Sequence, residues 1–277
     1  MGLRISTNVE SINAHRNMST SQGKMSNAMA QLSSGSQINK AADDAAGLAI
    51  SERLKGQIRS LRKANQNAND GISMVQVAEG GLNEIGNIIV RLRELGIQAA
   101  SDTVGNTERG FLDKEVQQLK SELERIAKVT TWGETKLLDG SSPSFDYQVG
   151  IFNDDFEDRI TFDSANNVAT LEALELADVD YTTKEGAQGA LRMLDSAQTT
   201  VNGYRANLGA LQNRLMSTVN NLSIAEENLS AANSRIRDPD VARAAADLTR
   251  ENILLNASIS TLSQANQAKS VALKLIG

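Results

Sequence analysis

The feature that most constrains this chain is an apolar stripe that runs without a break from residue 50 to residue 99. Every step along it is three or four residues, the spacing of one face of an α-helix. Proline breaks helices, and the 277 residues include only Pro143 and Pro239. At about 1.5 Å per residue the helix would be about 75 Å long and would need an equally long partner. The stripe comprises Ile50, Leu54, Ile58, Leu61, Ala64, Ala68, Ile72, Val75, Ala78, Leu82, Ile85, Ile89, Leu92, Leu95 and Ala99.

A second stripe with the same spacing lies further along the chain and can serve as that partner. A shorter third stripe lies between them, at Leu112, Val116, Leu119, Leu123 and Ile126. Together they predict an antiparallel three-helix bundle with knobs-into-holes packing, in which the first rod reverses near residues 102–106. The second stripe comprises Val201, Tyr204, Leu208, Leu211, Leu215, Val219, Leu222, Ala225, Leu229, Ala232 and Ile236.

The middle of the chain has a different period. Apolar and polar residues alternate from Phe145 to Ile151, and again around Thr161 between Ile160 and Phe162. A period of two predicts strands, and the acidic loop 153–158 would connect them as a hairpin. We therefore expect a mainly α fold, a long antiparallel helical bundle or coiled coil that pairs N- and C-terminal segments, with a small β region at about residues 133–180.

Both ends of the chain carry thinner apolar stripes. Neither has enough apolar area to fold alone, so we expect the two ends to be disordered in the isolated monomer. They would become helical when many copies pack them together, which is coupled folding and assembly. The residues expected to form these terminal polymerisation helices are Ile5, Val9 and Ile12 at the start, and Leu255, Ile259 and Leu262 near the end.

Several classes of function are excluded by what the sequence lacks. With one histidine, His15, and no cysteine, nucleophile triads and His-rich metal sites have almost nothing to draw on. We therefore expect no catalytic residue, metal or cofactor. Asp43 and Asp44 fit the start of a helix better than an acid–base pair. The acidic residues of loop 153–158 lack the spacing of a calcium loop and fit a solvated turn.

Charge and hydropathy exclude two classes of partner. The formal net charge is -6, and the basic residues are scattered, so the footprint of a nucleic-acid-binding surface is missing. The sequence has no apolar run of about 18 residues and no cleavable secretory signal at its start. We expect neither nucleic acid nor membrane as a partner.

Several segments at both ends resemble bacterial flagellins. The resemblance covers roughly residues 1–140 and 187–277, and its segments occur in the family's order. In the N-terminal part they are residues 32–35 (LSSG), 43–51 (DDAAGLAIS), 67–73 (NANDGIS) and 93–99 (RELGIQA). In the C-terminal part they are residues 208–215 (LGALQNRL), 234–238 (SRIRD) and 264–267 (QANQ).

This resemblance implies a structural subunit of the extracellular flagellar filament. It implies export through the flagellum's own type III apparatus with an export chaperone, and polymerisation with other flagellin copies under a filament cap protein, above the hook–filament junction protein. It also implies that residues 1–42 and 237–277 form an inner coiled-coil domain that depends on assembly, and that residues 43–236 form the surrounding shell. Since only about 45 residues separate the two matching regions, we expect no outer variable domain.

The family resemblance also points to recognition by an animal Toll-like receptor. In that family the receptor reads an Arg-x-x-x-Leu face and a Glu on the next helix, which correspond here to Arg91, Leu95 and Glu115. Two neighbouring residues depart from the family pattern, Val90 where Gln is frequent and Gly96 where a larger residue is usual. A third departure is Trp132-Gly133-Glu134 in place of Phe-Asn-Gly, which predicts a different local turn.

Three alternatives come from other classes of protein. A hook–filament junction protein shares paired helical ends but joins two structures. An enzymatic flagellin would need a zinc helix in its middle, and residues 141–186 contain no histidine. A membrane-active helical toxin would cause vesicle leakage.

The seam residues expected to carry self-assembly are Ile50, Leu54, Ile58, Leu61, Ile89, Leu92, Leu208, Leu211, Leu215, Leu222 and Leu229.

Overall fold

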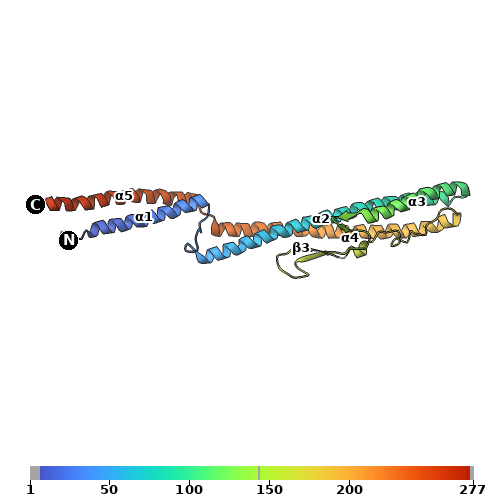
Figure 1. The fold of residues 1–277 in the computed structure, drawn as a ribbon, viewed down its shortest axis with the longest axis horizontal. Helices are drawn as coiled ribbons and strands as arrows, with labels where there is room; N and C mark the ends of the chain where they lie inside the picture. Colours follow the sequence, from blue (N-terminus) through green and yellow to red (C-terminus); the bar gives the residue numbers. More distant parts are fainter. Residues whose placement is uncertain (1–6, 143, 275–277) are drawn as a thin grey trace. The chain divides into compact units, whose positions relative to one another are not determined.

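A computed structural model describes residues 7–142 and 144–274, with side chains up to residue 267. The described residues are mainly helical, as the sequence predicts, and they divide into two compact units (Figure 1). One unit combines the residues up to Gly56 with those from Asn228 onward, and the other spans Gln57–Glu227. The helices are α1 (Val9–Ser34), α2 (Ala45–Ala99), α3 (Asn106–Val129), α4 (Lys184–Arg237) and α5 (Val241–Lys274).

Acidic side chains begin α2 where the sequence places them. The Asp44 carboxylate accepts the backbone N–H of Gly47 at 2.9 Å, and Asp43 accepts the N–H groups of Asn39 and Lys40. These carboxylates satisfy backbone donors at and just before the helix start and complement the positive end of its dipole.

The other end of α2 is closed by a buried arginine. Arg109, from the first turn of α3, donates to the carbonyl oxygens of Ala99 and Ser101, both at 2.8 Å. Its guanidinium thus supplies donors and positive charge to the helix C-terminus, where carbonyls lack helical partners. The reversal at residues 100–105 agrees with the predicted position.

Helices α2 and α4 are antiparallel in the unit that spans Gln57–Glu227. Polar contacts join Arg62 to Glu226 and Arg93 to Asp195, so the residue number on α4 falls as the number on α2 rises. The core between α2, α3 and α4 includes the predicted stripes, with Leu82, Ile85, Ile89, Leu92, Val116, Leu123, Val201, Leu208 and Leu215 fully buried.

Two small antiparallel sheets follow α3. Strand β1 (Thr131–Trp132) pairs with β2 (Thr135–Lys136), and β3 (Phe145–Gln148) pairs with β4 (Arg159–Phe162). The turn between β1 and β2 begins with Gly133 at φ +60°, a conformation that favours glycine. In the second hairpin Phe145 lies opposite Phe162, and their rings stack with centroids 6.0 Å apart. The predicted hairpin is therefore confirmed.

The predicted β region, residues 133–180, is wrong at its C-terminal end. The strands end at Phe162, and the chain continues as a short 3-10 helix, η1 (Ala165–Asn167), and irregular structure. Side chains of helix α3 hydrogen-bond to three backbone groups of this irregular segment. Buried Lys120 donates to the carbonyl oxygens of Ala177 and Val179, and Glu124 accepts the N–H of Leu171 at 2.9 Å.

Candidate assembly surface

Helices α1 and α5 lie side by side and antiparallel in the unit that contains both termini (Figure 1). The Asn8 side chain donates to the Ala265 carbonyl oxygen at 3.2 Å, and the Lys24 ammonium lies 3.9 Å from a Glu251 carboxylate oxygen. The less exposed positions recur with a heptad period on each helix. They are Ser11, Ala14, Met18, Ser21, Met25, Ala28 and Leu32 on α1, and Ala244, Leu248, Glu251, Leu255, Ser258, Leu262 and Ala265 on α5.

This seam is built mainly from small and flexible side chains. Alanine and serine let two helices approach closely, but they bury little apolar area. Only Ser21, Ala28, Ala244 and Glu251 are buried in the seam. The intramolecular seam alone therefore stabilises the pair weakly.

The predicted terminal residues divide between the seam and the outside. Leu255 and Leu262 lie in the seam and are half-buried. Val9, Ile12 and Ile259 are 59%, 58% and 50% exposed, so they lie outside the seam within the chain, and their role in polymerisation stays a prediction. The seam positions next to these residues are held by small side chains, Ser11 and Ala14 on α1 and Ser258 on α5. Ile5 lies outside the described residues.

More apolar side chains share this exposure. We call the exposed apolar residues of the two helices the outer apolar set. Since water contact with large apolar side chains is unfavourable, each of these residues would gain from being covered by another molecule. The set consists of Val9, Ile12, Met29, Val241, Ile253, Leu254 and Ile259.

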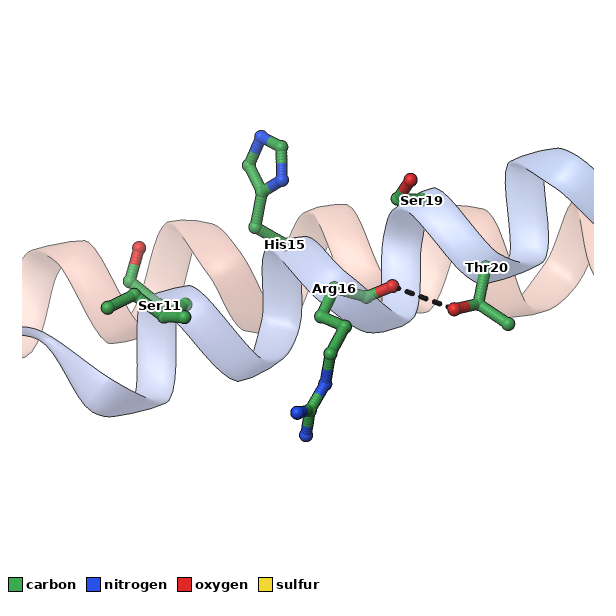
Figure 2. Close-up of a pocket in the computed structure, with 6 residues that line it drawn as sticks. Ser11, His15, Arg16, Ser19 and Thr20 are labelled. Atoms are coloured by element: carbon green, nitrogen blue, oxygen red, sulfur yellow. Dashed lines mark hydrogen bonds between the residues drawn. The ribbon is translucent and has the colours of Figure 1, made fainter.

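The histidine lies on the same helix but forms no reactive cluster. Figure 2 shows a shallow hollow along α1 in which His15 and Arg16 project to different sides of the helix. The dashed line there is the hydrogen bond from the Thr20 hydroxyl to the Arg16 carbonyl oxygen, 3.0 Å. No carboxylate lines the hollow, so nothing in it could orient His15 as a general base.

Searches for two other kinds of site were negative within the described ranges. Among residues 7–142 and 144–274 no three His, Cys, Asp or Glu side chains gather as a metal site would require. Over the same residues no helix is long and apolar enough to cross a membrane. In the acidic loop, Asp154 accepts the N–H groups of Phe156 and Glu157, and these bonds lower the pKa of its carboxyl.

Most predicted seam residues of the bundle are buried or half-buried. Leu54, Ile58, Leu61, Ile89, Leu92, Leu208 and Leu215 are buried, and Leu211, Leu222 and Leu229 are half-buried. Ile50 is 44% exposed, so its placement in the seam within the chain is wrong. Gly47, Ser51 and Leu54 hold the inward positions of that part of α2.

Arg237, which the sequence analysis did not single out, joins the two segments that connect α1 to α2 and α4 to α5. Its carbonyl oxygen accepts the Gln37 N–H at 2.6 Å, and its guanidinium donates to the Ser36 hydroxyl and pairs with Glu52. An arginine at a helix C-terminus usually serves the dipole. Its contacts with residues about 200 positions away could be found only from the structure.

The predicted receptor face is only partly assembled. Arg91 and Glu115 form an ion pair between α2 and α3, with 2.8 Å between the Arg91 Nη2 and Glu115 Oε1 atoms. Arg91 Nη1 also lies 3.0 Å from Glu94 Oε2. Glu115 and then Glu94 raise the pKa of the Arg91 guanidinium. Leu95 is 2% exposed and belongs to the hydrophobic core, and its part in a receptor face stays a prediction.

The structure explains why position 96, next to Leu95, is a glycine. A Cβ there would lie 3.0 Å from the hydroxyl oxygen of Tyr181, which occupies the space beside the helix. That hydroxyl donates to the Leu92 carbonyl oxygen at 2.7 Å, and burial raises the pKa of Tyr181 to about 12. A small residue at 96 thus leaves room for a buried tyrosine that fastens residues 163–183 to α2.

Comparison with known proteins explains the paired helical ends. A family model described as the bacterial flagellin N-terminal helical region matches residues 5–143, and one described as the C-terminal helical region matches residues 191–276. The chain belongs to the bacterial flagellin family. A flagellin of Halalkalibacterium halodurans is 43% identical over 272 residues, which cover 98% of this chain and 99% of that relative. A flagellin of Bacillus subtilis is 37% identical over 303 residues, covering 99% and 100%.

A solved structure supports the same fold. The crystal structure of Bacillus cereus flagellin matches 61% of this chain and 94% of its own, with a TM-score of 0.51 and 28% identity. This flagellin is therefore a structural subunit that polymerises into the extracellular flagellar filament used for motility. Nothing in the matches favours the hook–filament junction alternative.

Proposed function

We propose that the paired helices α1 and α5 form the assembly domain of this flagellin, and that the outer apolar set is the surface on which copies meet. The observation that carries the proposal is the exposure of large apolar side chains on both helices, outside the seam between them. Burying one such side chain contributes about 1.5–3 kcal/mol, so a few contacts for each subunit suffice to drive polymerisation.

The proposal includes the division of the chain. Residues 1–42 and 237–277 form the inner coiled-coil domain, and residues 43–236 form the shell around it, without an outer variable domain. In support, the α1–α2 and α4–α5 connections lie near these limits, at residues 35–44 and 238–240. The bundle seam residues, from Leu54 to Leu229, hold the shell together while neighbouring copies dock.

The same surface bears on the partners proposed for the subunit. Before assembly the outer apolar set would be covered by an export chaperone, and at the growing tip the filament cap protein would hold it until it docks. The first copies would stack on the hook–filament junction protein through the same helices. For an animal Toll-like receptor, Arg91 and Glu115 remain the exposed candidates. A catalytic role forms no part of the proposal.

Changing two members of the set tests the assembly role. The double variant Ile12→Ser and Ile259→Ser removes apolar contacts worth about 3 kcal/mol or more, and so should raise the critical concentration for seeded polymerisation about 100-fold. The matched control is Asn13→Ser with Ser260→Asn, at exposed positions next to the first two. Sedimentation of polymer at a series of subunit concentrations measures the effect. Equal critical concentrations in the two double variants would refute the proposal.

A further inference from the structure

The seam between α1 and α5 contains one charged side chain among its described positions, Glu251. This residue is 8% exposed, whereas the other seam residues on α5 are alanine, leucine and serine. On α1 the buried polar residue is Ser21. A carboxylate at such a position is unfavourable unless a partner compensates its lost hydration.

The compensation that Glu251 receives is partial. One carboxylate oxygen lies 3.9 Å from the Lys24 ammonium, whose side chain is 66% exposed. The other oxygen is buried and accepts no hydrogen bond from any residue in the described part of the chain. A leucine at position 251 would stabilise the pair more, because it would continue the apolar seam. Stability alone therefore does not account for Glu251.

The rest of the seam distinguishes one alignment of the helices poorly from another. Because its positions repeat every seven residues and, apart from Glu251, carry alanine, serine, methionine or leucine, a slip of one heptad replaces apolar contacts with similar ones. The slip would move the helices by about 10 Å along each other. Packing of Ala14, Met18, Met25 and Ala28 could not prevent it.

The Lys24–Glu251 contact does distinguish the alignments. One heptad before Lys24 the same flank of α1 carries Asn17, and one heptad after it carries Gln31. Neither can neutralise a carboxylate. In either slipped alignment Glu251 would stay buried without a cation, and a single polar or charged residue in a coiled-coil seam can specify the register in this way.

We infer that Lys24 and Glu251 fix the register of α1 against α5. They thereby fix where the members of the outer apolar set on α1 lie along the helix axis relative to those on α5. A slip would displace Ile12 and Met29 from Ile253 and Ile259 by about 10 Å, so a neighbouring copy could no longer meet both helices. The inference rests on the proposed assembly role of this helix pair. It makes Lys24 and Glu251 positioning residues for polymerisation.

Disulfide trapping can report the register, since the chain has no cysteine of its own. Ala14 and Thr261 line one small hollow between the helices, so Ala14→Cys with Thr261→Cys reports the observed register. Ala14→Cys with Leu254→Cys reports a slip of seven residues. Both pairs are placed in the full-length parent, in Glu251→Leu, and in the charge swap Lys24→Glu with Glu251→Lys. The matched control is Arg250→Leu, which changes the exposed neighbour.

Each variant is oxidised as the monomer and, separately, in seeded filaments. The oxidised filaments are then dissociated into subunits. Non-reducing electrophoresis with mass spectrometry separates intramolecular disulfides from those between copies. We expect the parent, the swap and Arg250→Leu to form the Thr261 disulfide in high yield and the Leu254 disulfide only in trace yield. Glu251→Leu should raise the yield of the Leu254 disulfide at least tenfold.

The inference is overturned if Glu251→Leu traps no more of the slipped register than Arg250→Leu does, in monomer and filament alike. It is also overturned if the charge swap slips as Glu251→Leu does. Polymerisation tests the assembly role separately. A normal critical concentration for the Ile12 and Ile259 double variant would refute that role, while the trapping result would still report the register.

Discussion

Replacing Leu215 by aspartate should destabilise the bundle strongly. Leu215 is fully buried in the hydrophobic core of the unit that spans Gln57–Glu227. The change removes about 1.5–3 kcal/mol of apolar burial and places a carboxylate in an apolar core. Together these effects should lower the free energy of unfolding by about 4 kcal/mol or more.

The neighbouring positions provide a graded series. Leu211 is half-buried, so an aspartate there can reach water and should cost about half as much. Met216 is exposed, and Met216→Asp should change the free energy of unfolding by less than about 0.5 kcal/mol. All three variants introduce the same charge on one helix, which makes Met216→Asp the matched control.

Thermal unfolding followed by circular dichroism measures the series. For a unit of this size, each kcal/mol shifts the melting temperature by about 2–4 °C, so Leu215→Asp should melt about 10 °C or more below the parent. The reasoning is refuted if Leu215→Asp and Met216→Asp melt together. A larger loss at position 211 than at position 215 would also contradict the assigned seam.

Other consequences can be checked with the same preparation. Deleting residues 250–277 should leave a soluble bundle that no longer polymerises, because α1 loses its partner; normal filaments in electron micrographs would contradict this. The N–H of Leu171, and then Lys128, keep the pKa of the Glu124 carboxyl below its ordinary value, so this carboxylate stabilises the fold above about pH 4.3. That contribution is lost as the pH falls through the lowered pKa. The melting temperatures of the parent and Glu124→Gln should therefore converge below about pH 4, whereas a gap that widened in acid would have the wrong sign. Tyr181→Phe should lower the free energy of unfolding by about 1 kcal/mol in urea titrations, because the Leu92 carbonyl keeps its helical partner; an unchanged midpoint would mean that the hydroxyl bond contributes nothing.

The bundle could be predicted from the sequence because its seam is long and regular. From Leu54 to Ala99 the inward positions carry apolar residues in nearly every turn, and the structure buries almost all of them. The hairpin from Phe145 to Phe162 could be predicted equally well, because apolar and polar residues alternate along each strand.

The terminal helices were predicted less well because their seam is made of residues that carry little pattern. Ala14, Ser21 and Ala28 occupy the seam on α1, while Ile12 stands outside it. Apolar periodicity follows large side chains, and on α1 the large side chains Val9 and Ile12 lie outside the seam within the chain. On α1 it therefore selects the outer surface, whereas on α5 it finds Leu255 and Leu262, which lie in the seam.

Buried cations were also beyond sequence reasoning. Lys120 is buried because the irregular segment at residues 177–179 offers its ammonium two carbonyl oxygens. Arg109 is buried because the end of α2 and the turn after it offer its guanidinium two carbonyl oxygens as well. These partners exist only once the chain has folded back on itself. The two departures from the family pattern at Gly96 and Gly133 could be recognised in the sequence, but their causes are a neighbouring tyrosine and a local turn.

The contacts of Arg237 have a mechanical consequence. The chain leaves the α1–α5 pair through two separate polypeptide links, and this residue ties one link to the other through its carbonyl and its guanidinium. A tensile load that enters along either terminal helix is therefore shared by both links before it passes on.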